Sequence, residues 1–219
     1  TTEVADALDK KGHFKNVYPI NYASNFHKVG KIKCVFTAFK SNYDLHSQIE
    51  AIEEGNIILI LTHECGDNAI FGDLISKYLI LYKNSNAIIV NGKVRDVSKL
   101  IKENYPIWSE GFTPIGCVNK KTKSFPKLKM KKLFNKYDDS IAVCDNGGVV
   151  IIEKSKINQN TLDKIKVLES QEDLWYFCLD TLKWSTKKIV CDKKYLKQTE
   201  NLSNIHKKNL NKLKKPFKA

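Results

Sequence analysis

Hydrophobic positions in the middle of the chain change from a continuous run to a helical period and back again. Residues 56–62 (NIILILT) form a short apolar run rich in isoleucine, which is typical of a strand buried on both faces. Apolar residues then recur at helical spacing at Leu74, Ile75, Tyr78, Leu79 and Tyr82. Either Asp67 or Asp73 could cap this helix. A second apolar run, residues 87–90, ends at Asn91-Gly92, a strong turn signal. The pattern predicts a strand–helix–strand crossover with parallel, neighbouring strands.

The same periodicities predict elements on both sides of this crossover. Strands are expected at residues 32–39, 141–144 and 149–152, and helices at residues 43–54, 97–103 and 159–183, the last as one or two helices. His46 is expected on the solvated face of its helix, and Trp175 and Trp184 in a core or a subunit contact. With 219 residues, 42% of them hydrophobic, the chain suits one large α/β domain.

Polar residues gather at the two ends of the central crossover. Gly66 and Gly72 would let the backbone approach a ligand where the helix begins, and the unbonded N–H groups of a first helical turn favour an anion. Arg95 and Asp96 follow the second strand, at the edge where open α/β sheets usually bind ligands. Alternatively, Arg95 and Asp96 form only a surface ion pair, and Gly72 serves only to permit close packing. Two glycines and Asp73 at one crossover favour a site.

This block carries a resemblance to a known family. Gly72-Asp73, a helix, and then residues 89–96 (IVNGKVRD) resemble the signature of the RraA-like family, which includes the class II 4-hydroxy-4-methyl-2-oxoglutarate/4-carboxy-4-hydroxy-2-oxoadipate aldolases. Weaker similarities follow in the family's order at residues 2–9, 30–37, 106–114 and 145–152. The resemblance runs from the first residue to about Cys191.

The resemblance implies a fold and an assembly. It implies a single RraA-like domain over residues 1–191, an α/β fold built as a layered β/β/α sandwich with parallel strand–helix–strand crossovers. Residues 192–219 would form a basic C-terminal extension. Family members form trimers or pairs of trimers with sites between subunits, so we expect a homotrimer or hexamer.

The resemblance also implies a chemistry. It implies a metal-dependent lyase that cleaves a 4-hydroxy-2-oxo acid, or decarboxylates oxaloacetate, through a pyruvate enolate. Asp96 would bind Mg²⁺ or Mn²⁺, Asp73 would hold a metal-bound water, and Arg95 would stabilise the enolate oxygen. The substrate-binding residues would be Gly72, Leu74, Ile75 and Arg95, with backbone N–H groups of Leu74 and Ile75 meeting the substrate carboxylate.

Two departures from the family pattern leave the substrate open. Twenty-one residues separate Asp73 from Arg95, one more than family enzymes commonly have. An insertion in residues 83–86 would be harmless, whereas one inside the helix would rotate Asp73 out of the site. In addition, the lysine-rich residues 120–136 replace the family's Pro-Gly-Asp turn.

The net charge of +13 raises a second interpretation. Residues 119–137 contain eight lysines and no acid, and residues 192–219 contain nine lysines against two acids. A basic loop and tail could bind nucleic acid or an RNA-processing partner, and some family members inhibit an RNA-degrading enzyme instead of catalysing a reaction. Biased composition explains the lysines equally well, since no RNA-binding motif accompanies them. The regulator lacks the acid that follows the arginine, so Asp96 favours the lyase. An interaction protein without activity is a third possibility.

Cysteine usage and hydropathy set the remaining expectations. None of the six cysteines forms a C-x-x-C or zinc-type spacing, and Cys34, Cys144 and Cys178 are expected to be buried, reduced thiols. Cys65 follows His63 at the mouth of the proposed site, but His-x-Cys without an orienting partner is typical of a loop. No apolar run approaches the length of a membrane span and no signal-peptide pattern opens the chain, so a cytoplasmic protein without a membrane partner is expected.

Overall fold

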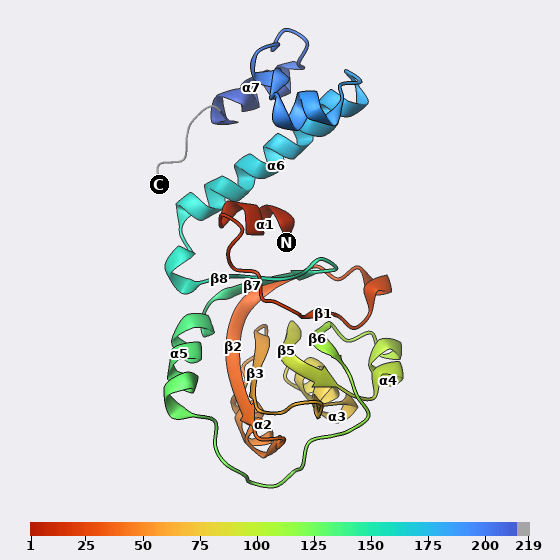
Figure 1. The fold of residues 1–219 in the computed structure, drawn as a ribbon, viewed down its shortest axis with the longest axis vertical. Coiled ribbons are helices and arrows are strands. Elements are labelled where there is room, and N and C mark those ends of the chain that lie inside the picture. Colours follow the sequence, from red (N-terminus) through yellow and green to blue (C-terminus); the bar gives the residue numbers. More distant parts are fainter. Residues whose placement is uncertain (214–219) are drawn as a thin grey trace. The chain divides into compact units, whose positions relative to one another are not determined.

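The computed structural model of the chain describes residues 1–213, with side chains described as far as residue 210 (Figure 1). Two compact units divide between Ile157 and Asn158. The domain boundary predicted at residue 191 therefore falls inside the second unit.

The first unit contains most of the regular elements. Its helices are α1 (Thr2–Ala7), α2 (Tyr43–Gln48), α3 (Asp73–Lys77), α4 (Val97–Lys102) and α5 (Lys127–Tyr137). Its strands are β1 (Tyr18–Pro19), β2 (Lys28–Ala38), β3 (Ile57–His63), β4 (Ala69–Phe71), β5 (Ala87–Val94), β6 (Ile107–Phe112), β7 (Ile141–Asp145) and β8 (Gly148–Ile152). Short 3₁₀ turns occur at Tyr22–Ser24, Ile49–Ala51 and Lys154–Lys156, and a π-helical turn, Tyr78–Tyr82, directly continues α3.

The strands form one sheet with the order β1-β6-β5-β3-β2-β7-β8, and β4 also pairs with β5. Strands β2, β3, β5 and β6 run parallel to one another. The outer pairs β1–β6, β2–β7 and β7–β8 are antiparallel. Strands β3 and β5 pair from Ile57 with Ala87 to Ile60 with Val90. The predicted crossover with parallel, neighbouring strands is confirmed.

Strand β2 connects two layers of this sheet. Its residues 28–31 pair with β7, and its residues 32–38 pair with β3. Because the same strand serves both partners, the β7–β8 hairpin is carried over one face of the parallel strands (Figure 1).

Alternating side chains divide the interior into two cores, one on each face of the parallel strands. On one face, Ile58, Ile60, Ile88 and Val90 pack with Leu45 of α2, Ile75 of α3 and Leu100 of α4. On the other face, Ile57, Leu59, Ala87 and Ile89 pack with Ala142, Cys144, Val149 and Ile151 of the hairpin. Burial of each isoleucine or leucine contributes roughly 1.5–3 kcal/mol. The layers follow the order hairpin, parallel sheet, helices, which confirms the predicted β/β/α arrangement.

The Asn91-Gly92 turn is a wrong prediction, because β5 continues through both residues to Val94. The Asn91 side chain accepts a hydrogen bond from the Thr62 backbone N–H at 2.7 Å and so joins β5 to β3. A Cβ at Gly92 would lie 2.9 Å from the Ile70 side chain. The glycine therefore allows β4 to lie close to β5, and this contact between strands overrides the local turn preference.

Other predictions about individual elements also differ from the structure. Helix α2 ends at Gln48 and continues only as the 3₁₀ turn. Helix α3 has Gly72 as its N-cap, so neither Asp67 nor Asp73 caps it. The lysine-rich segment expected as a loop contains the 11-residue helix α5.

The second unit is helical and has its own core. It contains α6 (Gln159–Asp180), a π-helical turn (Lys187–Cys191), a 3₁₀ turn (Lys194–Leu196) and α7 (Asn204–Leu213). Its core consists of Leu174, Cys178, Ile189, Tyr195, Leu202 and Leu210, and Trp175 and Trp184 pack against it, as predicted. The end of the predicted basic extension, residues 214–219, lies outside the described residues. Across the described part of the chain, every helix is too short or too polar to traverse a bilayer.

We expect Gly92→Ala to lower the free energy of unfolding by about 1–3 kcal/mol, because the added methyl group overpacks the contact with Ile70. Urea denaturation followed by circular dichroism measures this change. The neighbouring control, Lys93→Ala, removes a surface ion pair with Asp67 and should cost at most about 1 kcal/mol. Equal stability of wild type and Gly92→Ala would show that β4 does not require a glycine here.

Candidate functional site

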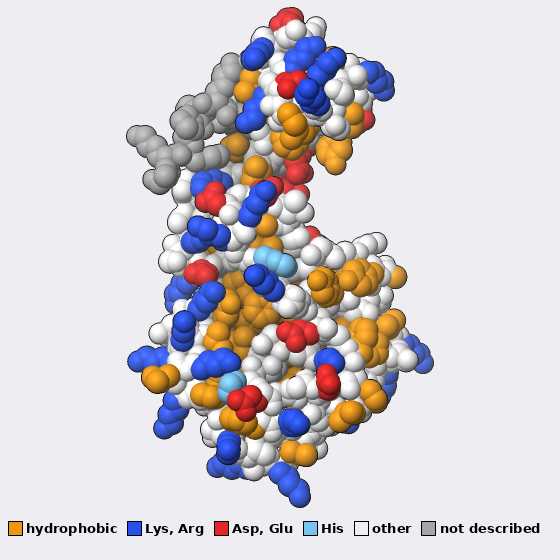
Figure 2. Space-filling model, in the orientation of Figure 1, with side chains coloured by type: hydrophobic (Ala, Val, Ile, Leu, Met, Phe, Trp, Pro, Cys, Tyr) orange, Lys and Arg blue, Asp and Glu red, His pale blue; other side chains and the backbone are white. Residues whose placement is uncertain are grey.

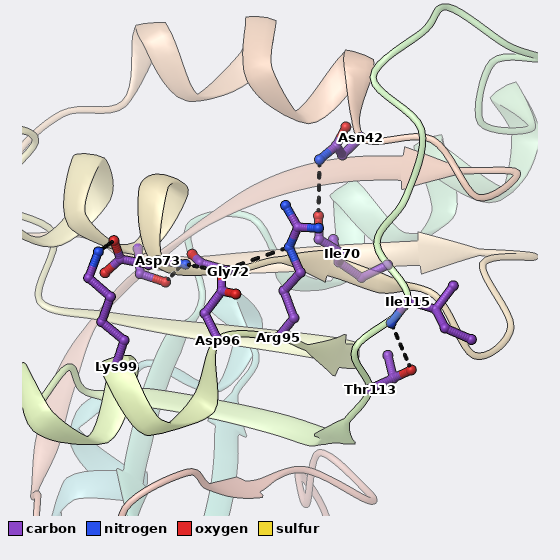
Figure 3. A network of polar contacts seen from close by, with 10 residues as sticks. Asn42, Ile70, Gly72, Asp73, Arg95, Asp96, Lys99, Thr113 and Ile115 are labelled. Atoms are coloured by element: carbon purple, nitrogen blue, oxygen red, sulfur yellow. Dashed lines mark hydrogen bonds and ion pairs between the residues drawn. The ribbon is translucent and has the colours of Figure 1, made fainter.

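Three segments of the first unit meet at the carboxyl end of β5 (Figure 3). The Arg95 backbone N–H donates to the carbonyl oxygen of Phe71, the last residue of β4, at 3.0 Å. On the other side of β4, Ala69 donates to Ile115 at 2.7 Å and accepts from Cys117 at 3.0 Å. Strand β4 therefore holds the end of β5, the start of α3 and residues 115–117 together.

Asp96 lies where β5 turns into α4, in the left-handed backbone region with φ of 58°. Its Oδ2 accepts a hydrogen bond from the Asp73 backbone N–H at 3.1 Å, so its carboxylate caps α3 from outside that helix. Arg95 Nε lies 3.8 Å from the same oxygen. The side chains of Arg95 and Asp96 are 51% and 46% exposed, so both remain open to a ligand.

Two glycines make room for this arrangement. A Cβ at Gly72 would clash with Asp96 Oδ2, and one at Gly116 would lie 2.6 Å from Arg95 Nη1. Gly72 was predicted from the sequence, whereas Gly116 was not, because Gly116 is brought to the site only by its pairing with β4. Gly66, which we expected near a ligand, lies in a turn with open space around it.

A pocket of about 120 Å³ lies beside these residues. Its lining includes the predicted residues Gly72, Leu74, Ile75, Arg95 and Asp96. It also includes Asn42, His46, Cys117 and Asn119, which were not predicted to line it. His46 therefore contributes to the pocket wall and does not point only into solvent as expected. Within residues 1–213, the backbone N–H groups of Leu74 and Ile75 donate to no protein acceptor. They remain available to an anion in the pocket.

Asn42 is the buried polar residue of this wall. Its side chain donates a long hydrogen bond to the Ile70 carbonyl oxygen at 3.4 Å, whereas its Oδ1 has no partner among the described residues. Asn42 also precedes α2 as its N-cap. A cap before a helix could be predicted from the sequence, but its contact with β4 is non-local and could not.

Asp73 is held differently from the other predicted residues. Its Oδ2 pairs with Lys99 Nζ on α4, and this hydrogen bond raises the pKa of Lys99 (Figure 3). Its Oδ1 is buried and has no hydrogen-bond partner in the described chain. The π-helical turn Tyr78–Tyr82 offers a place for the additional residue between Asp73 and Arg95, since a π turn contains one residue more than an α turn. That turn lies after Asp73.

The His-x-Cys motif does not form a nucleophile and base. The His63 imidazole contacts Glu64 at 3.4 Å and Lys129 at 2.9 Å, whereas Cys65 Sγ faces the His63 carbonyl oxygen. Cys34, Cys144 and Cys178 are buried free thiols, as predicted.

The oxygen atoms at this site suit one hard divalent cation. Residues 1–213 contain no cluster of three or more His, Cys, Asp or Glu side chains that could hold a metal. However, Mg²⁺ commonly keeps several waters and binds only one or two protein carboxylates. Asp96 is half-exposed with one oxygen outside the contacts described above, and Asp73 has an unpartnered buried oxygen one hydrogen bond away. The residues present therefore fit a magnesium or manganese ion.

Comparison with known proteins identifies similar sequences and folds. A family model described as RraA-like, Aldolase/RraA, matches residues 1–151. The second unit, which begins at Asn158, lies wholly outside this match.

Three solved structures share the fold at low sequence identity. An uncharacterized protein from Pseudomonas syringae pv. tomato has 18% identity and a TM-score of 0.67, with 85% of this chain and 86% of that chain covered. RraAS2 from Streptomyces coelicolor, described as an unusual member of the RNase ES inhibitor RraA protein family, has 16% identity, a TM-score of 0.59 and coverages of 80% and 89%. The RNA-processing inhibitor RraA from Thermus thermophilis has 16% identity, a TM-score of 0.54 and coverages of 69% and 91%.

We expect Gly72→Ala to displace the Asp96 carboxylate and thereby remove the cap of α3, because the new methyl group would occupy the position of Oδ2. Hydrogen exchange measured by NMR should show faster exchange at the Asp73 amide, and the unfolding free energy should fall by about 1 kcal/mol. Lys77→Ala, on the exposed face of the same helix, is the matched control and should leave that amide protected. An unchanged exchange rate in Gly72→Ala would contradict the capping role of Asp96.

Proposed function

The chain belongs to the RraA-like family, and we propose that it is a divalent-metal-dependent lyase that cleaves a 4-hydroxy-2-oxo acid, or decarboxylates oxaloacetate, through a pyruvate enolate. One observation carries the proposal: a carboxylate, a guanidinium and the N–H groups of a helix start converge on one small pocket. At about 120 Å³ this pocket is smaller than the roughly 300–1,000 Å³ typical of sites for drug-sized ligands. It suits a short acid.

Asp96 would hold the metal, with Asp73 beside it as the second carboxylate. Mg²⁺ or Mn²⁺ bound there would supply the positive charge that an enolate oxygen and the adjacent substrate carboxylate require. Lys99 pairs with the Asp73 side chain, which would help to position the metal environment. The Asp73 backbone N–H donates to the Asp96 carboxylate and would orient it.

The substrate carboxylate would accept hydrogen bonds from the backbone N–H groups of Leu74 and Ile75. Both groups have no protein acceptor among the described residues, and the positive end of the helix dipole favours a negative charge there. Gly72 would allow the substrate to approach the backbone at this point. The substrate would thus be fixed by its carboxylate with its keto group directed towards Arg95.

Arg95 would stabilise the negative charge that develops during bond cleavage. When the C3–C4 bond of the substrate breaks, its electron pair moves to the C2 oxygen of the enolate, and a donor placed in advance lowers the energy of that transition state. The Arg95 guanidinium is permanently charged and planar, and Gly116 leaves room beside its Nη1. Proton addition at C3 then gives pyruvate.

Among the proposed substrates, oxaloacetate requires the fewest catalytic groups. Aldol cleavage also requires a base for the C4 hydroxyl group, whereas decarboxylation releases CO₂ and needs no such base. An oxaloacetate assay therefore tests the roles of the metal, Arg95 and Asp96. It does not depend on the base for the C4 hydroxyl group, which is not identified.

A homotrimer or hexamer is part of the proposal. Three large apolar side chains close to the pocket are well exposed in a single chain: Leu74 by 77%, Ile115 by 59% and Phe112 by 51%. Apolar surface of this kind is typical of contacts between subunits. A neighbouring subunit at this position could complete the site.

The second candidate is a regulator that binds an RNA-processing enzyme. The exposed lysines of α5 and the preceding loop favour it, since Lys120, Lys121, Lys127, Lys131 and Lys132 have no acidic partner among the described residues. Against it, Figure 2 shows Lys and Arg spread over this face of both units with acidic and apolar side chains between them. Inhibition of an RNA-degrading enzyme together with no pyruvate release would select this candidate.

We expect Asp96→Asn to reduce metal-dependent release of pyruvate from oxaloacetate by at least about a hundredfold, because the amide loses the negative charge that would hold the cation. Coupled lactate dehydrogenase detects the pyruvate, and EDTA should abolish the wild-type activity. Asp67→Asn, which changes an exposed carboxylate paired with Lys93, is the control and should retain activity. Wild-type rates in Asp96→Asn would remove Asp96 from the mechanism.

We also expect Arg95→Lys to lose most of kcat, by about a hundredfold, because an ammonium group cannot reproduce the planar guanidinium. The same assay at saturating substrate separates kcat from KM. If only KM changes, Arg95 binds the ground state and does not stabilise the enolate.

A further inference from the structure

Two thiols lie between β4 and the pocket wall. Cys65 follows β3 in a turn, and its carbonyl oxygen accepts from the Asn68 backbone N–H at 3.2 Å. Cys117 lies on the segment paired with the other end of this turn, where its N–H donates to Ala69 at 3.0 Å. Asn68 Nδ2 also donates to Gly116 at 2.8 Å. These bonds tie the segment that contains Cys117 to the turn that begins at Cys65.

The two side chains are in direct contact. A hydrogen bond joins the thiols, and Cys117 packs against the core cluster that contains Cys65. Cys65 is 4% exposed, whereas Cys117 is partly exposed and lines the pocket. A small reagent that enters the pocket therefore has to pass Cys117 to reach Cys65, the thiol whose pKa is lowered.

We infer that Cys65 and Cys117 form a redox-active dithiol pair that a peroxide converts to an intramolecular disulfide, and that this bond changes the pocket wall beside Arg95. Both residues lie in turns or loops, so their backbones can adjust to the geometry that a disulfide requires. Formation of the disulfide does not depend on the proposed lyase activity, whereas its effect on substrate turnover rests on that proposal.

The chemistry balances with the peroxide as the oxidant. The thiolate of the pair attacks one peroxide oxygen, the O–O bond breaks, and a sulfenic acid and hydroxide form. The second thiol then attacks the sulfenic sulfur, forms the S–S bond and releases hydroxide. Taken with the two thiol protons, two thiols and hydrogen peroxide give one disulfide and two waters.

The electrostatics of the pair assist this reaction. The hydrogen bond from Cys117 lowers the pKa of Cys65 to about 7, and the same contact raises the pKa of Cys117. Thiolate is the reactive form, so the pair contains a substantial reactive fraction near neutral pH. By contrast, burial raises the pKa of Cys34 to about 12, which makes that thiol unreactive.

Formation of the bond would act on the pocket through Gly116. This glycine precedes Cys117 and lies so close to Arg95 Nη1 that it has no room for a Cβ. Movement of Cys117 towards Cys65 therefore shifts the backbone against which the guanidinium lies. The oxidised protein should bind or turn over an acid less well, and a reductant should restore it.

The test treats the full chain, first reduced and then freed of reductant, with a small excess of hydrogen peroxide under native conditions. Intact mass spectrometry should show the loss of two hydrogen atoms, and a non-reducing digest should yield one peptide pair that links Cys65 with Cys117. Cys117→Ser should give no linked pair and should accumulate a sulfenic acid at Cys65 that dimedone traps. Cys191→Ser, which removes an exposed thiol, is the matched control and should still give the link.

The outcomes separate this inference from the proposed function. Oxidation without a Cys65–Cys117 link, or crosslinks that depend on Cys191, would overturn the dithiol pair. A link that leaves oxaloacetate turnover of an active wild type unchanged would overturn the effect on the pocket. If neither redox form releases pyruvate, the lyase proposal fails, while ¹⁵N chemical shifts of Arg95 and Gly116 in the two forms still report whether the bond moves the wall.

Discussion

The hydrogen bond from the Asp73 backbone to the Asp96 carboxylate is the interaction on which the rest of the site depends. It joins the start of α3 to the end of β5, two points separated by an entire crossover. It also brings negative charge to the positive end of a helix, where that charge is stabilised. The bond occupies one carboxylate oxygen and fixes the direction of the other, so a single contact both caps a helix and orients a potential metal ligand.

This bond requires that three backbones approach closely, and small residues at the contacts permit it. Gly72 leaves space for Asp96, Gly92 for the Ile70 side chain and Gly116 for Arg95. Strand β4, only three residues long, pairs with β5 on one side and receives residues 115–117 on the other. The pocket therefore forms because β4 lies very close to the strands and segments on both of its sides. This close approach brings polar side chains from four segments to the same pocket.

The sequence predicts the part of this structure that depends on local pattern. The apolar runs predicted β3 and β5 and their parallel pairing, and the order of Gly72, Arg95 and Asp96 along the crossover indicated the sheet edge at which a pocket lies. The Asn91-Gly92 turn was wrong because a non-local contact with β4 decides that conformation. Asn42, Gly116 and Cys117 were missed for the same reason, since each reaches the pocket through pairing with a strand far away in the chain. No sequence period encodes such contacts.

The most direct measurement of the central claim is the anomalous diffraction of manganese in crystals soaked with Mn²⁺ and oxalate, a stable mimic of the pyruvate enolate. The account predicts an anomalous peak about 2.0–2.3 Å from the unbonded oxygen of Asp96, with one oxalate carboxylate against the N–H groups of Leu74 and Ile75. It predicts no peak at that position in crystals of Asp96→Asn. A peak elsewhere in the wild type, or an equal peak in both proteins, would contradict it.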